Sequence, residues 1–516
     1  METDVLIVGA GPTGLSLACQ FIRHGVEFVI VEKNEGVTPF SKAIGVQART
    51  LEIYEQLDLA QRAVSEGTIA GKGRMLAEGE VRGEIDLSAI GEGLSAYPYM
   101  LLLEQSKNEK LLYDYLRSQG RDVLWNTELV DFSQSSTGVS ARVQTAGSAD
   151  HTIEAKYLVG CDGAKSPTRH LLGLEFEGST FERMFYVADA QVDWEFSHDS
   201  LHICLSRDTL LVFFPLKGEK RYRIVGSFPE GHEKDEGEIL YEEIERHIKE
   251  KAKLNLDIHD VEWFSTYRVH TRHVNRFSEG KGFLAGDSAH IHTPAGGQGM
   301  NTGIQDAYNL AWKMALVLRG ANEKLLETYN EERLENAKRL LETTDRLFQF
   351  VAGSEWFLAF LRTNVLPAVA KYLLGLDAVK NFIFPTISQI GINYRHSSLS
   401  QHAGDEDFNI KAGDRMPYFV MDGKSIYDQL RQPKFHVLSF SDSPNDSAEF
   451  QRELGSAHGG AVDFHSLLLS PAIAEVFGTN KRFIVLLRPD NYIGFVSADT
   501  GLQNVTDYLT RIANRA

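Results

Sequence analysis

The stretch "DVLIVGAGPTGLSLACQFIRHGVEFVIVEK", residues 4–33, decides the fold. Its continuous apolar run at residues 5–8 predicts a buried parallel strand. Glycines 9, 11 and 14 follow in G-x-G-x-x-G spacing, and apolar residues then recur at helical spacing. A second apolar run, "FVIVE", ends at Glu32. The stretch therefore predicts a strand, a glycine turn, a helix and a second strand, which is the Rossmann-type unit.

Each glycine of this loop has a physical task. Gly9 makes the tight turn, Gly11 lets the backbone approach a pyrophosphate, and Gly14 lets helix and strand pack closely. The helix N-terminus offers free N–H groups and partial positive charge to phosphates. Glu32 is placed to accept hydrogen bonds from ribose hydroxyls. The loop predicts an adenosine-diphosphate cofactor and does not by itself distinguish NAD from FAD.

Two later segments continue the pattern. "YLVGCDGAKSPTRHLLG", residues 157–173, predicts a strand, a turn at Asp162-Gly163 and a short helix. "GFLAGDSAHIHTPAGGQGMNTGIQDAYNLAWK", residues 282–313, predicts an apolar strand, a loop and a long helix. Glycines 296, 297 and 299 precede that helix, so its first N–H groups are accessible.

In this order, the three segments resemble those of single-component FAD-dependent aromatic hydroxylases, the relatives of p-hydroxybenzoate hydroxylase and phenol hydroxylase. The resemblance covers roughly residues 4–342, and the chain is similar to the polyketide-hydroxylase branch. It implies one FAD, NADPH or NADH as transient electron donor, and O2. The implied reaction hydroxylates a phenolic or polycyclic polyketide-like aromatic substrate through a flavin C4a-hydroperoxide.

The resemblance also implies the cofactor contacts, in which the first loop holds the adenosine end and the second glycine loop lies against the isoalloxazine. One departure is Lys42, where many relatives carry an arginine at or near this position, because lysine cannot form a bidentate fork. No catalytic residue is assigned. The implied cofactor contacts are Gly9, Gly11, Pro12, Thr13, Gly14, Glu32, Lys33, Arg49, Gln105, Val130, Asp162, Gly286, Asp287, Pro294, Gly297, Gly299, Met300 and Asn301.

The predicted fold class is α/β. It comprises a Rossmann-type FAD-binding domain, an antiparallel-sheet substrate domain and a thioredoxin-like C-terminal domain that lacks a CxxC pair. The candidate substrate residues on the sheet are Phe213, Phe214, Tyr222 and Arg223. The predicted ranges are 1–72, 98–175 and 276–399 for the FAD-binding domain with a helical linker, 73–97 and 176–275 for the substrate domain, and 400–516 for the C-terminal domain.

Composition narrows the possible partners. A net charge of −18 over 516 residues argues against nucleic acid, which needs clustered Lys and Arg. Three cysteines without a CxxC pair fit inert thiols in a reducing cytoplasm. No signal peptide is expected before the first strand. The apolar region 347–376 is interrupted by Glu355, Arg362 and Lys371, so we expect helices packed against the body and no membrane span.

Alternative interpretations stay open at this point. An FAD-dependent reductase or dehydrogenase of the same fold would insert no oxygen, and a non-enzymatic FAD-binding sensor would turn nothing over. His290 and His292 lie two residues apart but lack the surrounding ligands typical of a metal site. The C-terminal domain is expected to be structural or to form a homodimer contact.

Overall fold

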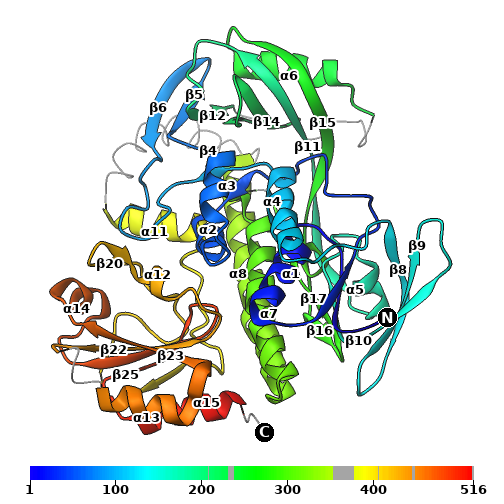
Figure 1. Cartoon of the computed structure of the whole chain (residues 1–516). Helices are drawn as coiled ribbons and strands as arrows, with labels where there is room; N and C mark the ends of the chain where they lie inside the picture. Colours follow the sequence, from blue (N-terminus) through cyan, green and yellow to red (C-terminus); the bar gives the residue numbers. More distant parts are fainter. Residues whose placement is uncertain are drawn as a thin grey trace.

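The computed structural model describes residues 1–206, 209–229, 238–293, 295–352, 377–404, 406–443 and 448–513. Figure 1 shows a Rossmann-type layer around the long helices, a second sheet above it, and a C-terminal unit beside it. Of the apolar region 347–376, for which we expected packed helices, residues 353–376 lie outside the described residues. Among the described helices, none has the length and apolarity needed to cross a bilayer.

A seven-stranded sheet carries the first glycine loop. Its parallel core has the order β17-β10-β1-β2, with β16 at one edge, and the antiparallel β9 and β8 extend from β10. The apolar residues of β1 are fully buried, as their continuous run predicted. The strands are β1 (Glu2–Val8), β2 (Phe28–Val31), β8 (Thr127–Gln134), β9 (Val139–Thr145), β10 (His151–Gly160), β16 (Ser278–Glu279) and β17 (Gly282–Leu284).

Helices pack on this sheet and connect it to the other units. Helix α1 follows the first glycine loop, and α7 follows the second. The helices are α1 (Pro12–His24), α2 (Ala48–Glu55), α3 (Ala60–Glu66), α4 (Gln105–Ser118), α5 (Pro167–Leu171), α7 (Gly299–Leu318), α8 (Glu327–Ala352) and α11 (Asp377–Ile387). Short elements complete this part: β3 (Gly45–Val46), β4 (Thr68–Ile69), β7 (Leu101–Leu102), η1 (Gly286–Ser288), η2 (Ala295–Gly297) and η3 (Glu323–Leu326).

The second sheet has eight strands in the order β18-β15-β11-β14-β13-β12-β5-β6. Strands β11, β13, β14 and β15 pair antiparallel, as the alternating sequence predicted, whereas β12 and β5 pair parallel. Helix α6 (Tyr241–Ala252) packs Ile244 and Ile248 into a core on one face of this sheet. The strands are β5 (Lys72–Ala77), β6 (Glu80–Asp86), β11 (Phe176–Asp193), β12 (Ser200–Leu205), β13 (Leu210–Pro215), β14 (Arg221–Ser227), β15 (Asp257–Val274) and β18 (His290–Ile291).

The C-terminal unit has its own sheet in the order β19-β25-β24-β22-β23. Strand β22 pairs parallel with β23 and antiparallel with β24, and helices alternate with the strands. Its main elements are β19 (Gln401–Ala403), β22 (Phe435–Ser441), α13 (Ala448–His458), β23 (Val462–Leu468), α14 (Pro471–Phe477), β24 (Phe483–Leu487), β25 (Ile493–Ser497) and α15 (Leu502–Ala513). The small elements β20 (Val420–Met421), β21 (Lys424–Ser425), α12 (Ile426–Gln429) and η6 (Gly459–Ala461) complete it.

Candidate active site

The first glycine loop leaves an open cradle at Gly11. A Cβ atom at Gly9 would lie 2.5 Å from the Cys161 carbonyl oxygen, and one at Gly14 would lie 1.9 Å from that of Gly9. At Gly11, by contrast, a Cβ atom would meet nothing within 4 Å. Helix α1 has Pro12 in its first turn and no side-chain cap, so the side chains leave its N–H groups available. The loop is packed on two sides and open where a pyrophosphate would approach.

Glu32 is fixed beside this cradle. Its Oε2 accepts a hydrogen bond from the Ala10 N–H at 2.8 Å, and its Oε1 accepts one from the Asn34 N–H at 3.0 Å. The carboxylate is half-buried, and its remaining lone pairs can accept ribose hydroxyls. Lys33, the next residue, is exposed.

Thr13 brings the two glycine-rich segments together. A Cβ atom at Gly286 would lie 2.4 Å from Thr13 Oγ1, and one at Gly303 of α7 would lie 2.3 Å from it. Gly286 has a φ of +66°, which also favours glycine. The start of α1, the turn after β17 and the first turns of α7 therefore meet at one side chain. Gly303 was missed by our sequence analysis, although it lies four residues after Gly299.

A buried charge cluster holds the turn that carries Asp287. Asp306 Oδ2 accepts the Gly286 N–H at 2.9 Å and contacts His290 Nε2 at 2.7 Å. Its Oδ1 accepts the Arg333 Nε–H at 2.6 Å. Burial opposes ionisation of Asp306, but Arg333 and His290 outweigh it and hold the pKa below its usual value. Asp306 was not among the predicted site residues, although it is the one carboxylate in helix α7.

Asp287 lies on this turn between the buried residues Gly286 and Ser288. Its side chain is exposed, yet desolvation by the surrounding protein raises its pKa, against the opposing charges of His290 and Lys42. Gly297 is likewise exposed, with a φ of +63°.

The start of α7 is clamped by Asn301. Its Oδ1 accepts the Gln47 N–H at 2.9 Å, and its Nδ2 donates to the Gly45 carbonyl at 2.9 Å. The side chain thus joins β3 to α7, and only its backbone remains available to a cofactor. A Cβ atom at Gly299 would make an ordinary 3.5 Å contact with His292, so the protein itself leaves room for one. Met300 is nearly buried and accepts from Asn108 Nδ2 at 3.4 Å.

The structure places Arg49 differently from our expectation. Its guanidinium is buried against Glu52 at 3.1 Å and donates to the Asp490 carbonyl of the C-terminal unit at 2.8 Å. It also lies over the Tyr492 ring, 5.1 Å from the centroid. Because these partners fix the guanidinium between the first sheet's helices and the C-terminal unit, we withdraw Arg49 from the expected phosphate contacts.

Two other predicted cofactor contacts, Asp162 and Gln105, form hydrogen bonds within the protein. Asp162 accepts hydrogen bonds from Ser166 Oγ at 2.5 Å and from the Thr168 N–H at 2.9 Å, so its side chain caps α5. Gln105 Oε1 accepts the Ala43 N–H at 3.2 Å. Val130 lies in a bulge of β8 and is 38% exposed. Pro294 lies outside the described residues.

The predicted substrate residues divide between the two faces of the eight-stranded sheet. Phe213 and Tyr222 are fully buried in the core shared with α6. Phe214 and Arg223 are paired neighbours on the opposite face, where Phe214 is half-buried. Arg223 is buried and forms a bidentate pair with Asp189, at 2.7 Å for both contacts. Of the four predicted substrate residues, only Phe214 and Arg223 lie on the face of the sheet opposite α6.

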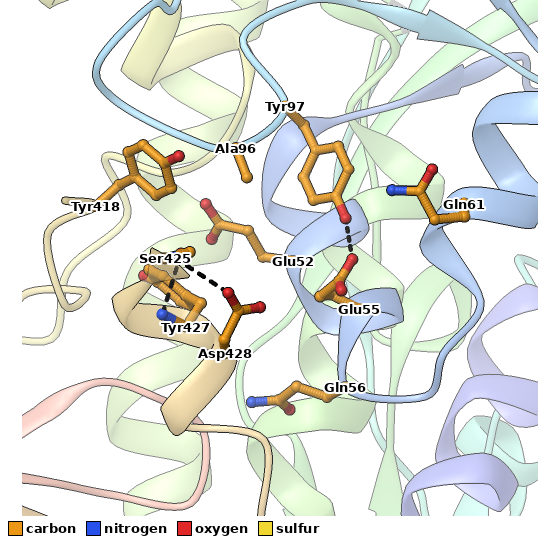
Figure 2. Close-up of a pocket in the computed structure, with 10 residues that line it drawn as sticks. All are labelled: Glu52, Glu55, Gln56, Gln61, Ala96, Tyr97, Tyr418, Ser425, Tyr427 and Asp428. Atoms are coloured by element: carbon orange, nitrogen blue, oxygen red, sulfur yellow. Dashed lines mark hydrogen bonds between the residues drawn. The ribbon is translucent and has the colours of Figure 1, made fainter. Parts of the chain in front are cut away.

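A separate cavity of about 240 Å3 lies between α2 and the C-terminal unit. Figure 2 shows Glu52, Glu55 and Tyr97 on one side and Tyr427 and Asp428 on the other. None of its lining residues belongs to the glycine loops. The cavity is therefore distinct from the cradle described above.

His290 and His292 have structural partners. His290 contacts Asp306, and its ring stacks on Phe277 with centroids 5.7 Å apart. His292 Nδ1 donates to the Thr293 carbonyl at 2.9 Å, and burial lowers its pKa to about 4. Within the described ranges, no group of three or more His, Cys, Asp or Glu side chains could hold a metal ion. The three cysteines are buried free thiols.

The site's residues fit FAD. The cradle is open at Gly11, the carboxylate of Glu32 is fixed beside it, and Asp287 is exposed on the turn that Asp306 holds. The family model described as an FAD binding domain matches residues 2–344. The chain belongs to this family.

Relatives of this FAD-binding family member extend over nearly the whole chain. It is 33% identical to a flavin-dependent monooxygenase of Mycobacteroides abscessus, over 98% of this chain and 99% of the relative. It is 30% identical to the 6-methylpretetramide 4-monooxygenase of Streptomyces rimosus, over 98% of this chain and 92% of the relative. The solved structure of OxyS anhydrotetracycline hydroxylase from Streptomyces rimosus matches with a TM-score of 0.79, 28% identity and 99% coverage of both chains.

These matches confirm the resemblance seen in the sequence. The chain is an FAD-dependent monooxygenase of the aromatic hydroxylase class. This interpretation is favoured over a reductase or dehydrogenase of the same fold. The comparison and the sheet topology also confirm the mixed α/β fold with an FAD-binding layer.

Proposed function

We propose that this monooxygenase uses NADPH or NADH and O2 to hydroxylate a phenolic, fused-ring aromatic substrate of the polyketide type. The names of several relatives support this substrate class. They act on 6-methylpretetramide, anhydrotetracycline and rifampicin, as well as the single-ring pentachlorophenol. A fused-ring phenol offers the electron-rich carbon that such hydroxylation needs.

The single observation that carries the proposal is an apolar cluster between the eight-stranded sheet and the segments around β3 and β7. Half-buried Phe214 and Ile203 on the sheet pack in one cluster with Ile44 and Met100 of the FAD-binding layer. Ile44 directly precedes β3, which Asn301 ties to α7. Half-buried apolar side chains of this kind are typical of the lining of a site for a flat aromatic ring system.

FAD, when bound, supplies the redox chemistry that passes electrons from the nicotinamide to O2. The chain's own residues prepare the site for it. Backbone N–H groups at the start of α7 favour negative charge beside the ring system. The apolar cluster excludes water, which protects the reaction from unproductive decay. Glu32 and the cradle at Gly11 would hold the adenosine and pyrophosphate of FAD.

We keep the division of the chain that the sequence predicts. We assign residues 1–72, 98–175 and 276–399 to the FAD-binding domain, 73–97 and 176–275 to the substrate domain, and 400–516 to a thioredoxin-like domain. The β-α-β-α-β-β-α order of the last unit from β22 to α15 supports that likeness. All three cysteines precede it, so redox chemistry by a CxxC pair is ruled out. A cytoplasmic location and a homodimer contact stay predictions of the sequence.

The test is oxidation of NADPH and NADH by the purified holoenzyme with a panel of monocyclic phenols and fused-ring phenols. We expect fused-ring phenols to stimulate both NAD(P)H oxidation and O2 uptake. The product should gain one oxygen atom, which mass spectrometry with 18O2 detects. Stimulation by monocyclic phenols alone would overturn the proposed substrate class, and NAD(P)H oxidation without any labelled product would overturn hydroxylation of the tested substrates.

A further inference from the structure

Glu109 differs from the other buried carboxylates of the described chain. It lies on α4 and is 3% exposed. In the part of the chain that the structure describes, every other buried carboxylate belongs to an ion pair, and Glu109 does not. The paired carboxylates are Glu52, Glu104, Asp189, Asp306, Glu332, Asp414 and Asp490. A buried carboxylate without a cation is costly, so its retention calls for a reason.

Glu109 joins the connection that follows Glu32 to the start of helix α4. Its Oε2 accepts the Thr38 N–H at 2.8 Å, and its Oε1 accepts the Gln105 Nε2–H at 2.9 Å. Thr38 belongs to the connection that runs from Glu32 to β3, and Gln105 begins α4. The carboxyl group therefore positions the connection against the helix. Both donors are neutral, so they satisfy its oxygens without neutralising a charge.

The charged groups around Glu109 do not neutralise the negative charge of its carboxylate. Glu32, at the end of β2, is the charged side chain that acts on it, and it has the same sign. On α4 itself, Lys107 pairs with Glu104 and Lys110 pairs with Asp114. Lys33 and Lys42, on the connection, are exposed. Burial raises the pKa of Glu109 to about 7, the hydrogen bonds from Gln105 and Thr38 oppose this, and the charge of Glu32 adds to it.

FAD would bring further negative charge into the same region, because its pyrophosphate occupies the cradle beside Glu32. We propose that Glu109 binds a proton from solvent when FAD binds, so that cofactor uptake is linked to the uptake of one proton at this carboxyl group. The neutral carboxyl group relieves the repulsion from Glu32 and from the pyrophosphate. It remains able to accept a hydrogen bond, so Glu109 keeps its positioning role.

The direction of the pH dependence follows from linkage. The bound state holds the proton more tightly than the apoprotein, so FAD binds most tightly where Glu109 is already neutral. As pH rises above about 7, binding has to take up a proton, and the dissociation constant rises by at most about tenfold per pH unit.

Calorimetric titration of the apoprotein with FAD tests the proposal. Titrations in two buffers of different ionisation enthalpy give the number of protons taken up, and we would run them from about pH 6 to pH 9. We expect net uptake above pH 7 in the wild type, and none in Glu109→Gln, which is neutral at every pH. The variant should bind FAD at pH 8.5 about as tightly as the wild type does at pH 6. Asp114→Asn, on the exposed side of the same helix, should keep the wild-type profile.

Three outcomes would overturn the proposal. The first is an absence of proton uptake in the wild type, which is measured without any variant and holds even if Glu109→Gln fails to fold. The second is wild-type uptake in Glu109→Gln, which would assign the proton to another group. The third is a lower melting temperature in Glu109→Gln with an unchanged pH profile of FAD binding, which would leave Glu109 a purely structural role.

Discussion

At the scale of single residues, Glu32 combines two tasks that can be measured together. It fixes the first glycine loop through the Ala10 N–H and is placed to accept ribose hydroxyls. We predict that Glu32→Ala weakens FAD binding by about 1–3 kcal/mol, the range for lost hydrogen bonds to a charged group. Fluorescence titration of the apoprotein with FAD measures this loss. Unchanged affinity would remove Glu32 from the cofactor contacts.

A substitution at Gly299 can distinguish a contact with the cofactor from a structural requirement for glycine. The protein leaves ordinary space for a Cβ atom there, and Gly299 lies in the first turn of α7 without a positive φ. We predict that Gly299→Ala keeps or slightly raises the melting temperature of the apoprotein, since alanine favours helix by about 1 kcal/mol. In the holoenzyme the added methyl group should weaken FAD binding or lower the flavin midpoint potential. Normal affinity and potential would show that this glycine does not contact the flavin.

At the scale of elements, the two faces of the eight-stranded sheet separate Phe214, a proposed substrate contact, from Phe213, a core residue. Phe214 faces the apolar cluster near α7, and its neighbour Phe213 faces α6. We predict that Phe214→Ala raises KM and the fraction of NAD(P)H oxidised without hydroxylation, with a small change in melting temperature. Phe213→Ala should instead cost about 3–5 kcal/mol of unfolding free energy. Product yield per NAD(P)H and urea unfolding check the pair, and equal effects at both positions would refute this assignment of faces.

Helix α8 carries a second test, because it ties the FAD-binding layer to the C-terminal unit. Glu332 accepts hydrogen bonds from Lys313 at 2.7 Å and from Arg488 at 2.5 Å, and all three side chains are fully buried. We predict that Glu332→Ala lowers the unfolding free energy by about 3–5 kcal/mol, since it leaves the buried Lys313 ammonium without a carboxylate and Arg488 with Asp490 as its remaining ion-pair partner. Glu335 forms an exposed pair with Arg339 on the same helix, so Glu335→Ala should cost at most about 1 kcal/mol. Similar losses in both variants would contradict this reasoning.

The elements also show what sequence could and could not predict. The Rossmann-type unit, its three glycines and Glu32 follow from local spacing, because the motif and its elements are contiguous. Alternation predicted the antiparallel sheet but not which face of it packs against Ile44 and Met100, so Phe213 and Phe214 were not distinguished. Arg49 was misplaced because its partner Asp490 lies 441 residues away. Glu109 escaped notice because nothing local marks a buried carboxylate that lacks a cation.

At the scale of the whole molecule, buried histidines govern stability in acid. Burial lowers the pKa of His202, His292 and His436 to about 4 each, from an ordinary 6.5. These side chains bind protons more readily in the unfolded chain, so unfolding takes up protons between about pH 6.5 and pH 4. Each unit of pKa difference corresponds to about 1.4 kcal/mol, and the three histidines lie in different units of the fold.

We therefore predict that the melting temperature falls steeply as pH drops from about 6.5 to 4. The contribution of Glu109 to stability has the opposite pH dependence. Its raised pKa of about 7 adds stability that is fully present below pH 4.5 and is lost as pH rises through 7. His436 contacts His465, with ring nitrogens 3.1 Å apart. Protonation of both rings in the folded protein would therefore place two positive charges side by side, in addition to the cost of burial. Calorimetric melting of wild type and of His436→Gln should show a shallower acid limb in the variant. An identical limb would mean that the C-terminal unit does not take part in the cooperative acid transition.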